Sequence, residues 1–409
     1  MKIKELTIQA FELFAENSPL KSYMQSVEYA RLMGECHYNY DYVGLVDEKG
    51  TIHAASLILI KKIGFNTRYG YAPKGFLVNY YDEKLLRTFT SELKKFYTRK
   101  NVTFIKVNPE IVVGEVDAKT FEFKSNPNMI LKTDLQRFGF VKLKDNLYFE
   151  SSEPRFNAYI DLKNAKFTNY SKTNRNKVRN SKRKGLYIVK GFERNLDEYA
   201  RLTDPKRYNF YKGLFNIFSS KDKIDLILVR VDFEKYIKNS QELYDMEQNN
   251  NNLLNEILHR SHRPEDLNKK MASDAKICTI KNEIIAATEG LRNNNDCLVA
   301  GAIVIKSGNR VHILESAFDR KYASLNANYF LYDQLIENYK LDYEYLDIGG
   351  ITGDFKETNP YHGLMRFKLG FNPKVYEFIG EYDLVFNQID YEYLSKSGKL
   401  ASEFNKKDI

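Results

Sequence analysis

The residues with the clearest chemical pattern lie near the C-terminal end, in the stretch YEYLDIGGITGDFKETNPYHGLMRFKLGF at residues 343–371. A strand expected over 345–348 ends at Gly349 and Gly350, because glycine permits a positive φ or a close approach of another backbone. A polar loop follows, and then the cations Arg366 and Lys368. A strand that opens into a glycine-rich loop and paired cations is a common way to bind an anion. The alternative is a tight turn with solvated charges, since a lone glycine pair is a weak signal.

A second candidate region is a basic stretch at residues 163–190, with no acid between Asp161 and Glu193. We expect a helix over 169–184 that ends at Gly185 and is cationic on nearly every face. Such a helix repels itself, so it indicates a polyanionic partner, either RNA or a pyrophosphate-bearing substrate. The candidate contacts are Lys172, Arg175, Lys177, Arg179, Lys182 and Arg183. The alternative is a surface helix neutralised only by counter-ions.

Several familiar kinds of catalytic chemistry are missing from the sequence. There is no GxSxG motif, no Walker loop and no acetyl-CoA pyrophosphate loop. The histidines are scattered, and His259 and His262 have no nearby cysteine, so we expect no metal and no resident cofactor. These absences fit attack of an amine on an activated ester, in which the protein supplies orientation and charge stabilisation.

The composition limits the class of protein. The chain has 409 residues, 43% hydrophobic and 29% charged, which suggests two or three domains. Its net charge of +9 favours phosphate-rich partners but does not choose among them. Three distant cysteines indicate a reduced, cytoplasmic compartment. We expect neither a signal peptide nor a membrane span.

The elements around these candidates follow an order that occurs twice. We expect helices over 3–16, 26–33 and 82–97 and strands over 42–46, 52–60, 69–71 and 102–107. The order returns with strands over 298–305 and 310–316, a helix over 324–339 and the strand over 345–348. Lys74 and Lys106 lie at the ends of first-half strands and are candidates for lining a groove, although each is equally consistent with plain surface charge. The repeat predicts an α/β (α+β) fold of two acetyltransferase-like (GNAT-like) domains.

Residues 233–293 differ from both halves. Apolar residues recur at spacings of three and four over 233–260 and 265–291, with a turn at 259–264. This pattern predicts an antiparallel helical hairpin, or coiled-coil arm. The predicted domains are therefore residues 1–150, residues 151–232 with 294–395, the arm at 233–293 and a tail at 396–409.

The motifs together resemble the FemABX family of aminoacyltransferases, which build peptidoglycan interpeptide bridges. The resemblance rests on YAPKGF (71–76), FIKVNPE (104–110), SKTNRNKVRNSKRKGL (171–186), the arm and the 343–371 stretch. It implies transfer of an amino acid from aminoacyl-tRNA to the stem-peptide amine of a lipid-linked or nucleotide-linked muropeptide precursor. The implied setting is the cytoplasm, in peripheral contact with the inner membrane face, with possible homo- or hetero-oligomers of related transferases.

The resemblance also implies roles for single residues. Lys368 falls where the family has a lysine near the reacting groups, so it would stabilise the oxyanion or a substrate phosphate. Lys212 lies near an arginine that contacts the precursor in some members, and Arg207 competes for that role. Asp347, Gly349 and Gly350 would shape the loop, and Arg366 would bind substrate. One departure is Met33, which stands where some members carry a substrate-binding lysine.

Two other functions remain open at this point. An acyl-CoA-dependent N-acyltransferase would use the same scaffold, although the missing pyrophosphate loop disfavours it. An RNA-binding protein without enzymatic activity would use the basic helix and the arm.

Overall fold

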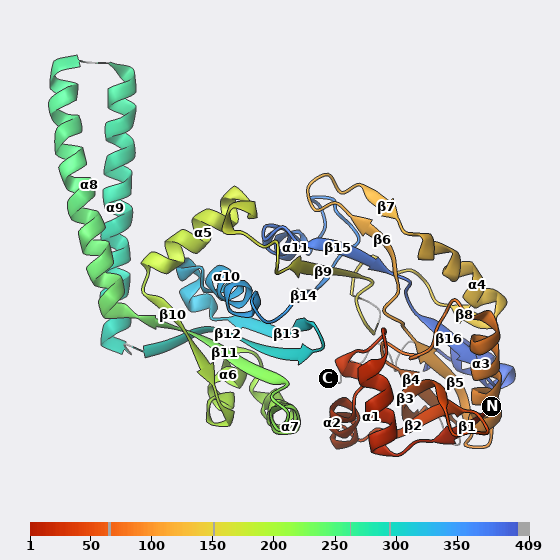
Figure 1. Ribbon diagram of the computed structural model, residues 1–409. Coiled ribbons are helices and arrows are strands. Elements are labelled where there is room, and N and C mark those ends of the chain that lie inside the picture. The colour runs from red at the N-terminus through yellow and green to blue at the C-terminus, as the bar shows by residue number, and fades with distance from the viewer. Residues whose placement is uncertain (64–66, 150–151, 262, 294–295, 400–409) are drawn as a thin grey trace.

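The computed structural model of the protein describes residues 1–63, 67–149, 152–261, 263–293 and 296–399 (Figure 1). Residues 400–409 of the expected tail and His262 at the expected turn lie outside these ranges. Figure 1 shows a body built on two β-sheets, from one end of which two long helices project.

Within the described residues, the first sheet has seven strands and the second has nine. The order in the first sheet is β1 (Lys2–Glu5), β2 (Asn39–Val46), β3 (Ile52–Lys62), β4 (Arg68–Ala72), β5 (Val102–Val107), β16 (Tyr382–Val385) and β8 (Phe140–Lys142). The order in the second is β10 (Leu186–Gly191), β11 (Ile224–Asp232), β12 (Asp296–Ser307), β13 (Arg310–Phe318), β14 (Tyr345–Ile351), β9 (Phe156–Asp161), β15 (Lys374–Phe378), β6 (Val112–Val116) and β7 (Phe123–Ser125).

The two sheets exchange strands. β6 and β7 come from the first third of the chain but pair within the second sheet, whereas β16 comes from the C-terminal part and pairs with β5. The predicted boundary at residue 150 therefore separates chain segments but not sheets.

The repeated order predicted from the sequence is confirmed. In the first half, the hairpin β3–β4 leads through α3 (Glu83–Thr98) to β5, which is parallel to β4. In the second half, the hairpin β12–β13 leads through α10 (Ala327–Tyr339) to β14, which is parallel to β13. Each helix supplies the crossover that a parallel pair of strands requires.

Two predicted helices begin too early in the sequence. The expected helix over 3–16 is wrong at its start, because β1 pairs there with β2 and α1 (Ile8–Asn17) begins only after Thr7. The Thr7 hydroxyl accepts a hydrogen bond from Ala10 N–H at 3.2 Å and so fixes the helix start. The expected helix over 324–339 begins instead at Ala327, because Asn326 is left-handed with φ +56°.

Alternating residues of β11 show how the second sheet is covered on both faces. Val229 and Val231 belong to the core beneath α10, whereas Leu226 and Leu228 belong to a core shared with the first half of the chain. The first face carries α5 (Lys172–Arg183), α10 and α11 (His362–Leu369), and the second carries α6 (Leu196–Leu202) and α7 (Tyr208–Ser219). The shared core also includes residues of α1 and α2 (Val27–Glu35).

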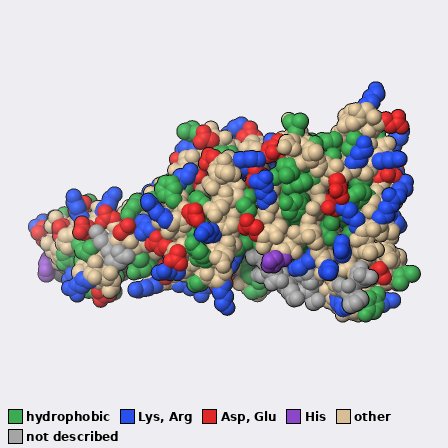
Figure 2. All heavy atoms as spheres, turned by 90° about the horizontal axis from the view of Figure 1, so that it is seen from below, with side chains coloured by type: hydrophobic (Ala, Val, Ile, Leu, Met, Phe, Trp, Pro, Cys, Tyr) green, Lys and Arg blue, Asp and Glu red, His purple; other side chains and the backbone are tan. Residues whose placement is uncertain are grey.

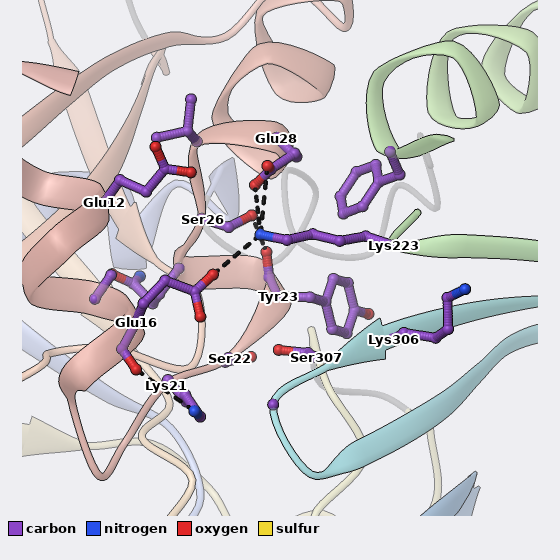
Figure 3. Close-up of a pocket in the computed structure, with 15 residues that line it drawn as sticks. Glu12, Glu16, Lys21, Ser22, Tyr23, Ser26, Glu28, Lys223, Lys306 and Ser307 are labelled. Carbon is purple, nitrogen blue, oxygen red and sulfur yellow. Dashed lines mark hydrogen bonds and ion pairs between the residues drawn. The ribbon is translucent and has the colours of Figure 1, made fainter. Parts of the chain in front are cut away.

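An ion-pair cluster joins the halves beside this shared core (Figure 3). Glu28 of α2 is only 3% exposed and lies 2.9 Å from Lys221, just before β11. Lys223 lies 3.4 Å from Glu28 and 3.0 Å from Glu16 of α1. We call Glu12, Glu16, Glu28, Lys221 and Lys223 the interdomain ion cluster, because its acids and lysines come from different halves of the chain.

The projecting helices are α8 (Phe233–Ser261) and α9 (Pro264–Asn293), and they form the predicted hairpin. Their seam is polar near the middle, where Asn251 donates a hydrogen bond to the Ser273 hydroxyl at 3.1 Å. The shorter helices α4 (Leu131–Arg137) and α12 (Gln388–Lys396) lie beside the first sheet. Among the described helices, none is long and apolar enough to cross a membrane.

Candidate active site

The candidate site lies where β13 and β14 diverge. The two strands pair through three residues each and stop at His312 opposite Asp347. Beyond this point β14 continues alone beside β9, while β13 stays paired only with β12. The backbone between the two strands therefore opens toward Gly349 and Gly350.

Asp347 holds this opening in shape. Its carboxylate lies 3.1 Å from His312 Nδ1 and accepts a hydrogen bond from Gly349 N–H at 2.8 Å. Burial opposes the charge on Asp347, but these hydrogen bonds outweigh burial and hold its pKa below the usual value. An ionised carboxylate with both oxygens engaged is suited to fixing the loop rather than to accepting a proton.

The two glycines are required by two different constraints. Gly349 has φ +79°, a conformation that side chains with a Cβ rarely adopt. Gly350 lies against Pro154, so that a Cβ at Gly350 would come within 2.3 Å of the proline ring. The expected end of the strand at the glycine pair is wrong, because β14 continues through it to Ile351; the pair is a packed irregularity in the strand, and the Gly350 carbonyl is available to a neighbour.

That neighbour is Lys368 of α11. Its Nζ donates a hydrogen bond to the Gly350 carbonyl at 2.8 Å, and the residue is only 8% exposed. Burial lowers the pKa of Lys368 to about 8, against the opposing charge of Asp347. Lys368, Asp347, Gly349 and Gly350, all predicted from the sequence, thus form one site.

The first half of the chain contributes Lys74 to the same region. Lys74 is 8% exposed, its Nζ lies 3.5 Å from the Glu153 carboxylate, and its backbone N–H donates to Asn108. Burial disfavours the Lys74 charge, but the carboxylates of Glu153, Glu110 and Asp347 outweigh it and raise the pKa of Lys74. Lys74 therefore remains cationic between the two halves.

Lys106, unlike Lys74, is buried against acidic residues at and beside β16 of the first sheet. It is 2% exposed, and its Nζ lies 3.4 Å from Asp383 and 3.5 Å from Glu381. Tyr391 of α12 donates a hydrogen bond to Asp383 at 2.7 Å and covers the pair. The structure thus gives Lys106 acidic partners within the first sheet.

Lys212 lies on α7, on the opposite face of the second sheet from α11. Its side chain is half exposed and lies 3.5 Å from Glu193. Arg207, the competing residue, donates to both oxygens of Glu315, on the part of β13 that pairs only with β12, at 2.7 and 2.6 Å. Tyr211 of α7 donates a hydrogen bond to the same carboxylate at 2.9 Å, so Arg207 and Lys212 both lie on the α7 side of the second sheet.

Arg366 and Lys368 lie on different sides of α11. Residues two apart on a helix point to different sides, and Arg366 is exposed whereas Lys368 is buried against β14. The two cations that look paired in the sequence therefore belong to opposite sides of α11.

The α5 cations separate into two groups. Asn174, Val178 and Ser181 form a buried face, so the expectation of a helix that is cationic on nearly every face is wrong. Three candidates already have partners in the protein: Arg175 (carbonyls of Thr168 and Tyr170), Lys182 (Asp333) and Arg183 (Glu283). The other three, Lys172, Lys177 and Arg179, are exposed, as is Lys182 beside Asp333.

Sequence reasoning missed several residues of the site. Glu153 comes from the segment before β9, and Tyr23 comes from the short helix before α2, where its ring lies 5.2 Å from that of His312. Only the register of β13 against β14 places His312 beside Asp347. Among the residues that the structure describes, no group of three or more His, Cys, Asp or Glu side chains could hold a metal ion.

Comparisons with known proteins show the family and the fold. The model of the FemAB family matches residues 6–397. Aminoacyltransferase FemB of Staphylococcus epidermidis (strain ATCC 12228 / FDA PCI 1200) is 25% identical, over 99% of this chain and 100% of that protein. Aminoacyltransferase FemA of Staphylococcus aureus (strain bovine RF122 / ET3-1) is 21% identical, over 93% of this chain and 94% of that protein. The crystal structure of FemX has a TM-score of 0.73 at 17% identity and covers 96% of this chain and 100% of its own, which shows the shared fold.

Proposed function

Because this chain belongs to the FemAB family and is an aminoacyltransferase, we propose that it adds an amino acid from aminoacyl-tRNA to the stem-peptide amine of a peptidoglycan precursor. The product would be part of an interpeptide bridge. Its acceptor would be a lipid-linked or nucleotide-linked muropeptide, reached in peripheral contact with the inner membrane face.

One observation carries this proposal: the buried amine of Lys368 at the open end of β14. The proposed reaction is attack of the acceptor amine on the ester carbonyl. It forms a C–N bond through a tetrahedral oxyanion and breaks the bond to the ribose oxygen, which takes up the proton that the amine gives away. A cation held in a water-poor site stabilises such an oxyanion more strongly than one in bulk water.

The neighbours of Lys368 would then orient it. The hydrogen bond to Gly350 holds the ammonium in place, and the Asp347 charge favours its protonated form. Lys74, between the two halves, would attract an anionic part of the acceptor. Arg207 or Lys212 would contact the precursor, and the Glu315 carboxylate fixes the position of the Arg207 guanidinium.

The exposed α5 cations Lys172, Lys177 and Arg179 are proposed as the outer contact with tRNA. Arg175, Lys182 and Arg183 have partners within the protein, so their removal would disturb the structure as well as any RNA contact.

The test is a transfer assay with a pool of charged tRNAs and a lipid-linked pentapeptide precursor, read by product mass. A gain of one aminoacyl group supports the proposal, and its loss in Lys368→Ala supports the site. Lys356→Ala is the matched control, because Lys356 is exposed and lies in the loop before α11. Transfer from acyl-CoA instead, or tRNA binding without transfer to any acceptor, would overturn the proposal.

A further inference from the structure

His312 and Asp347 form a sheltered pair at the point where β13 and β14 diverge. His312 is 8% exposed, and its Nδ1 lies 3.1 Å from the Asp347 carboxylate. On the face of the molecule seen in Figure 2, by contrast, acidic and basic side chains are interspersed over the surface. A histidine that is oriented by a buried carboxylate is a common arrangement for a group that accepts and returns a proton.

The two ring nitrogens of His312 have different surroundings. Asp347 is held in its ionised form, and an ionised carboxylate only accepts hydrogen bonds, so it favours the tautomer in which Nδ1 carries the proton. Among the described residues, Nε2 of His312 has no hydrogen-bond partner. The lone pair of Nε2 is therefore available to accept a proton from a substrate.

His312 points toward the first half of the chain. Val311 and Ile313, its neighbours in β13, belong to the core beneath α10, and side chains alternate between the two faces of a strand. His312 therefore lies on the opposite face, where its ring is 5.2 Å from that of Tyr23, a residue of the first half. An acceptor that enters between the two halves would reach His312 from this side.

Lys368 approaches the same place from the other face of the sheet. Its amine extends from α11, on the α10 side, to the Gly350 carbonyl at 2.8 Å. The Asp347 charge favours the protonated form of Lys368, and the same carboxylate holds His312. Because β13 and β14 diverge beyond Asp347, His312 and Lys368 can act on one reacting centre from its two sides.

We propose that His312 takes the proton from the attacking acceptor amine and returns it to the ribose oxygen of the donor. This inference rests on the proposed function, which leaves the route of that proton open. As the C–N bond forms, Nε2 takes up the amine proton. As the bond to the ribose oxygen breaks, Nε2 gives this proton to that oxygen, so His312 ends the reaction neutral, as it began.

The test measures single-turnover transfer by the full-length protein with two variants, His312→Asn and His312→Ala. The asparagine amide can donate to Asp347 from about the position of Nδ1, but it has no proton acceptor in place of Nε2. The alanine variant leaves space for a small ring added to the solution. His53→Asn is the matched control, because His53 forms a second His–Asp pair, 2.9 Å from Asp47, at the β2–β3 turn.

We expect both His312 variants to transfer about a hundredfold more slowly at saturating acceptor, since general acid–base catalysis contributes at least this much. His312→Asn should keep the melting temperature of the unchanged protein, because its hydrogen bond to Asp347 remains. Imidazole should speed up His312→Ala about tenfold. Pyrrole, a ring of the same size without a basic nitrogen, should not, and His53→Asn should transfer at the unchanged rate.

Two outcomes would overturn the inference and leave the proposed function standing. If His312→Asn transfers as fast as the unchanged protein, the hydrogen bond to Asp347 is all that His312 supplies; this variant decides the question even if His312→Ala does not fold. If imidazole and pyrrole have the same effect on folded His312→Ala, including none, the ring only fills space. Failure of the unchanged protein to transfer an amino acid from any charged tRNA would instead contradict the proposed function itself, and this inference with it.

Discussion

The amine of Lys368 donates a hydrogen bond to the carbonyl of Gly350 at 2.8 Å and thereby joins α11 to the end of β14. The backbone at this contact depends on the glycine pair, because Gly349 has φ +79° and a Cβ on Gly350 would meet Pro154 at 2.3 Å. Helix, strand and glycine turn therefore form one unit, and each can be altered separately.

Replacing Lys368 by methionine should abolish transfer without unfolding the protein. The pKa of this lysine falls from 10.5 to about 8 in the folded state, a difference of about 2.5 units or roughly 3 kcal/mol of unfavourable burial at neutral pH. Loss of the hydrogen bond to Gly350 offsets about 1 kcal/mol of the gain. We expect a melting temperature equal to or above that of the unchanged protein at pH 7. A clear drop in melting temperature would show that Lys368 stabilises the fold.

The pH dependence of transfer should change slope near pH 8. The acceptor amine loses its proton as pH rises, so the rate should increase about tenfold per unit below pH 8. Above pH 8, Lys368 loses its charge at the same pace, and the rate should level off. Single-turnover rates with saturating donor measure this, and Lys368→Arg, if active, should show no change of slope. If the transfer rate of the unchanged protein keeps rising through pH 9, Lys368 does not take part in the chemical step.

The three glycines near the site should tolerate alanine very differently. Gly349→Ala places a Cβ at φ +79°, which should cost about 1–2 kcal/mol. Gly350→Ala meets Pro154 at 2.3 Å and should displace the loop. Gly363→Ala on α11 meets no atom within 4 Å and should be neutral or stabilising. Urea unfolding gives the free energy of unfolding of each variant, and a transfer assay gives its rate. Equal losses of stability and rate in all three variants would contradict the specific constraints on Gly349 and Gly350.

Glu28 of the interdomain ion cluster should make the free energy of unfolding depend on pH. Burial opposes its charge, but the hydrogen bond from Lys221 and the charges of Lys221 and Lys223 outweigh burial and lower its pKa. A lowered carboxyl pKa stabilises the fold above the unfolded value of 4.5, and this stabilisation is lost as pH falls through the folded value. Glu28→Gln should therefore cost about 1–3 kcal/mol at pH 7 and progressively less below pH 4.5.

The control for this prediction is Glu83→Gln, which removes an exposed ion pair with Arg87 on α3. Such surface pairs contribute about 0.5 kcal/mol or less. Calorimetry at pH 7 and pH 3.5 measures both variants. A Glu28→Gln penalty that is the same at the two pH values would contradict the electrostatic origin.

Local patterns in the sequence predicted the elements well where the apolar periodicity was strong, as in α3, β5, α8 and α9. They failed at residues 2–5, because pairing with β2 is a long-range contact that overrides a weak helical pattern. They also failed to show that Arg366 is exposed and Lys368 is buried, because the sequence of a short helix does not indicate which of its sides packs against the sheet.

The sequence by itself determined the repeated order of elements, the hairpin and the residue types at the end of β14, because hydrophobic spacing and glycine have local consequences. Only the tertiary structure decided which of many cations are paired with acids inside the fold and which are left exposed. Asp383 and Glu381 pair with Lys106, and Glu283 pairs with Arg183, across long stretches of chain. Burial, which shifts the Lys368 pKa, likewise arises only when α11 packs on β14. Ion pairing and desolvation depend on which groups are close in space, and this proximity cannot be read from the separation of residues along the chain.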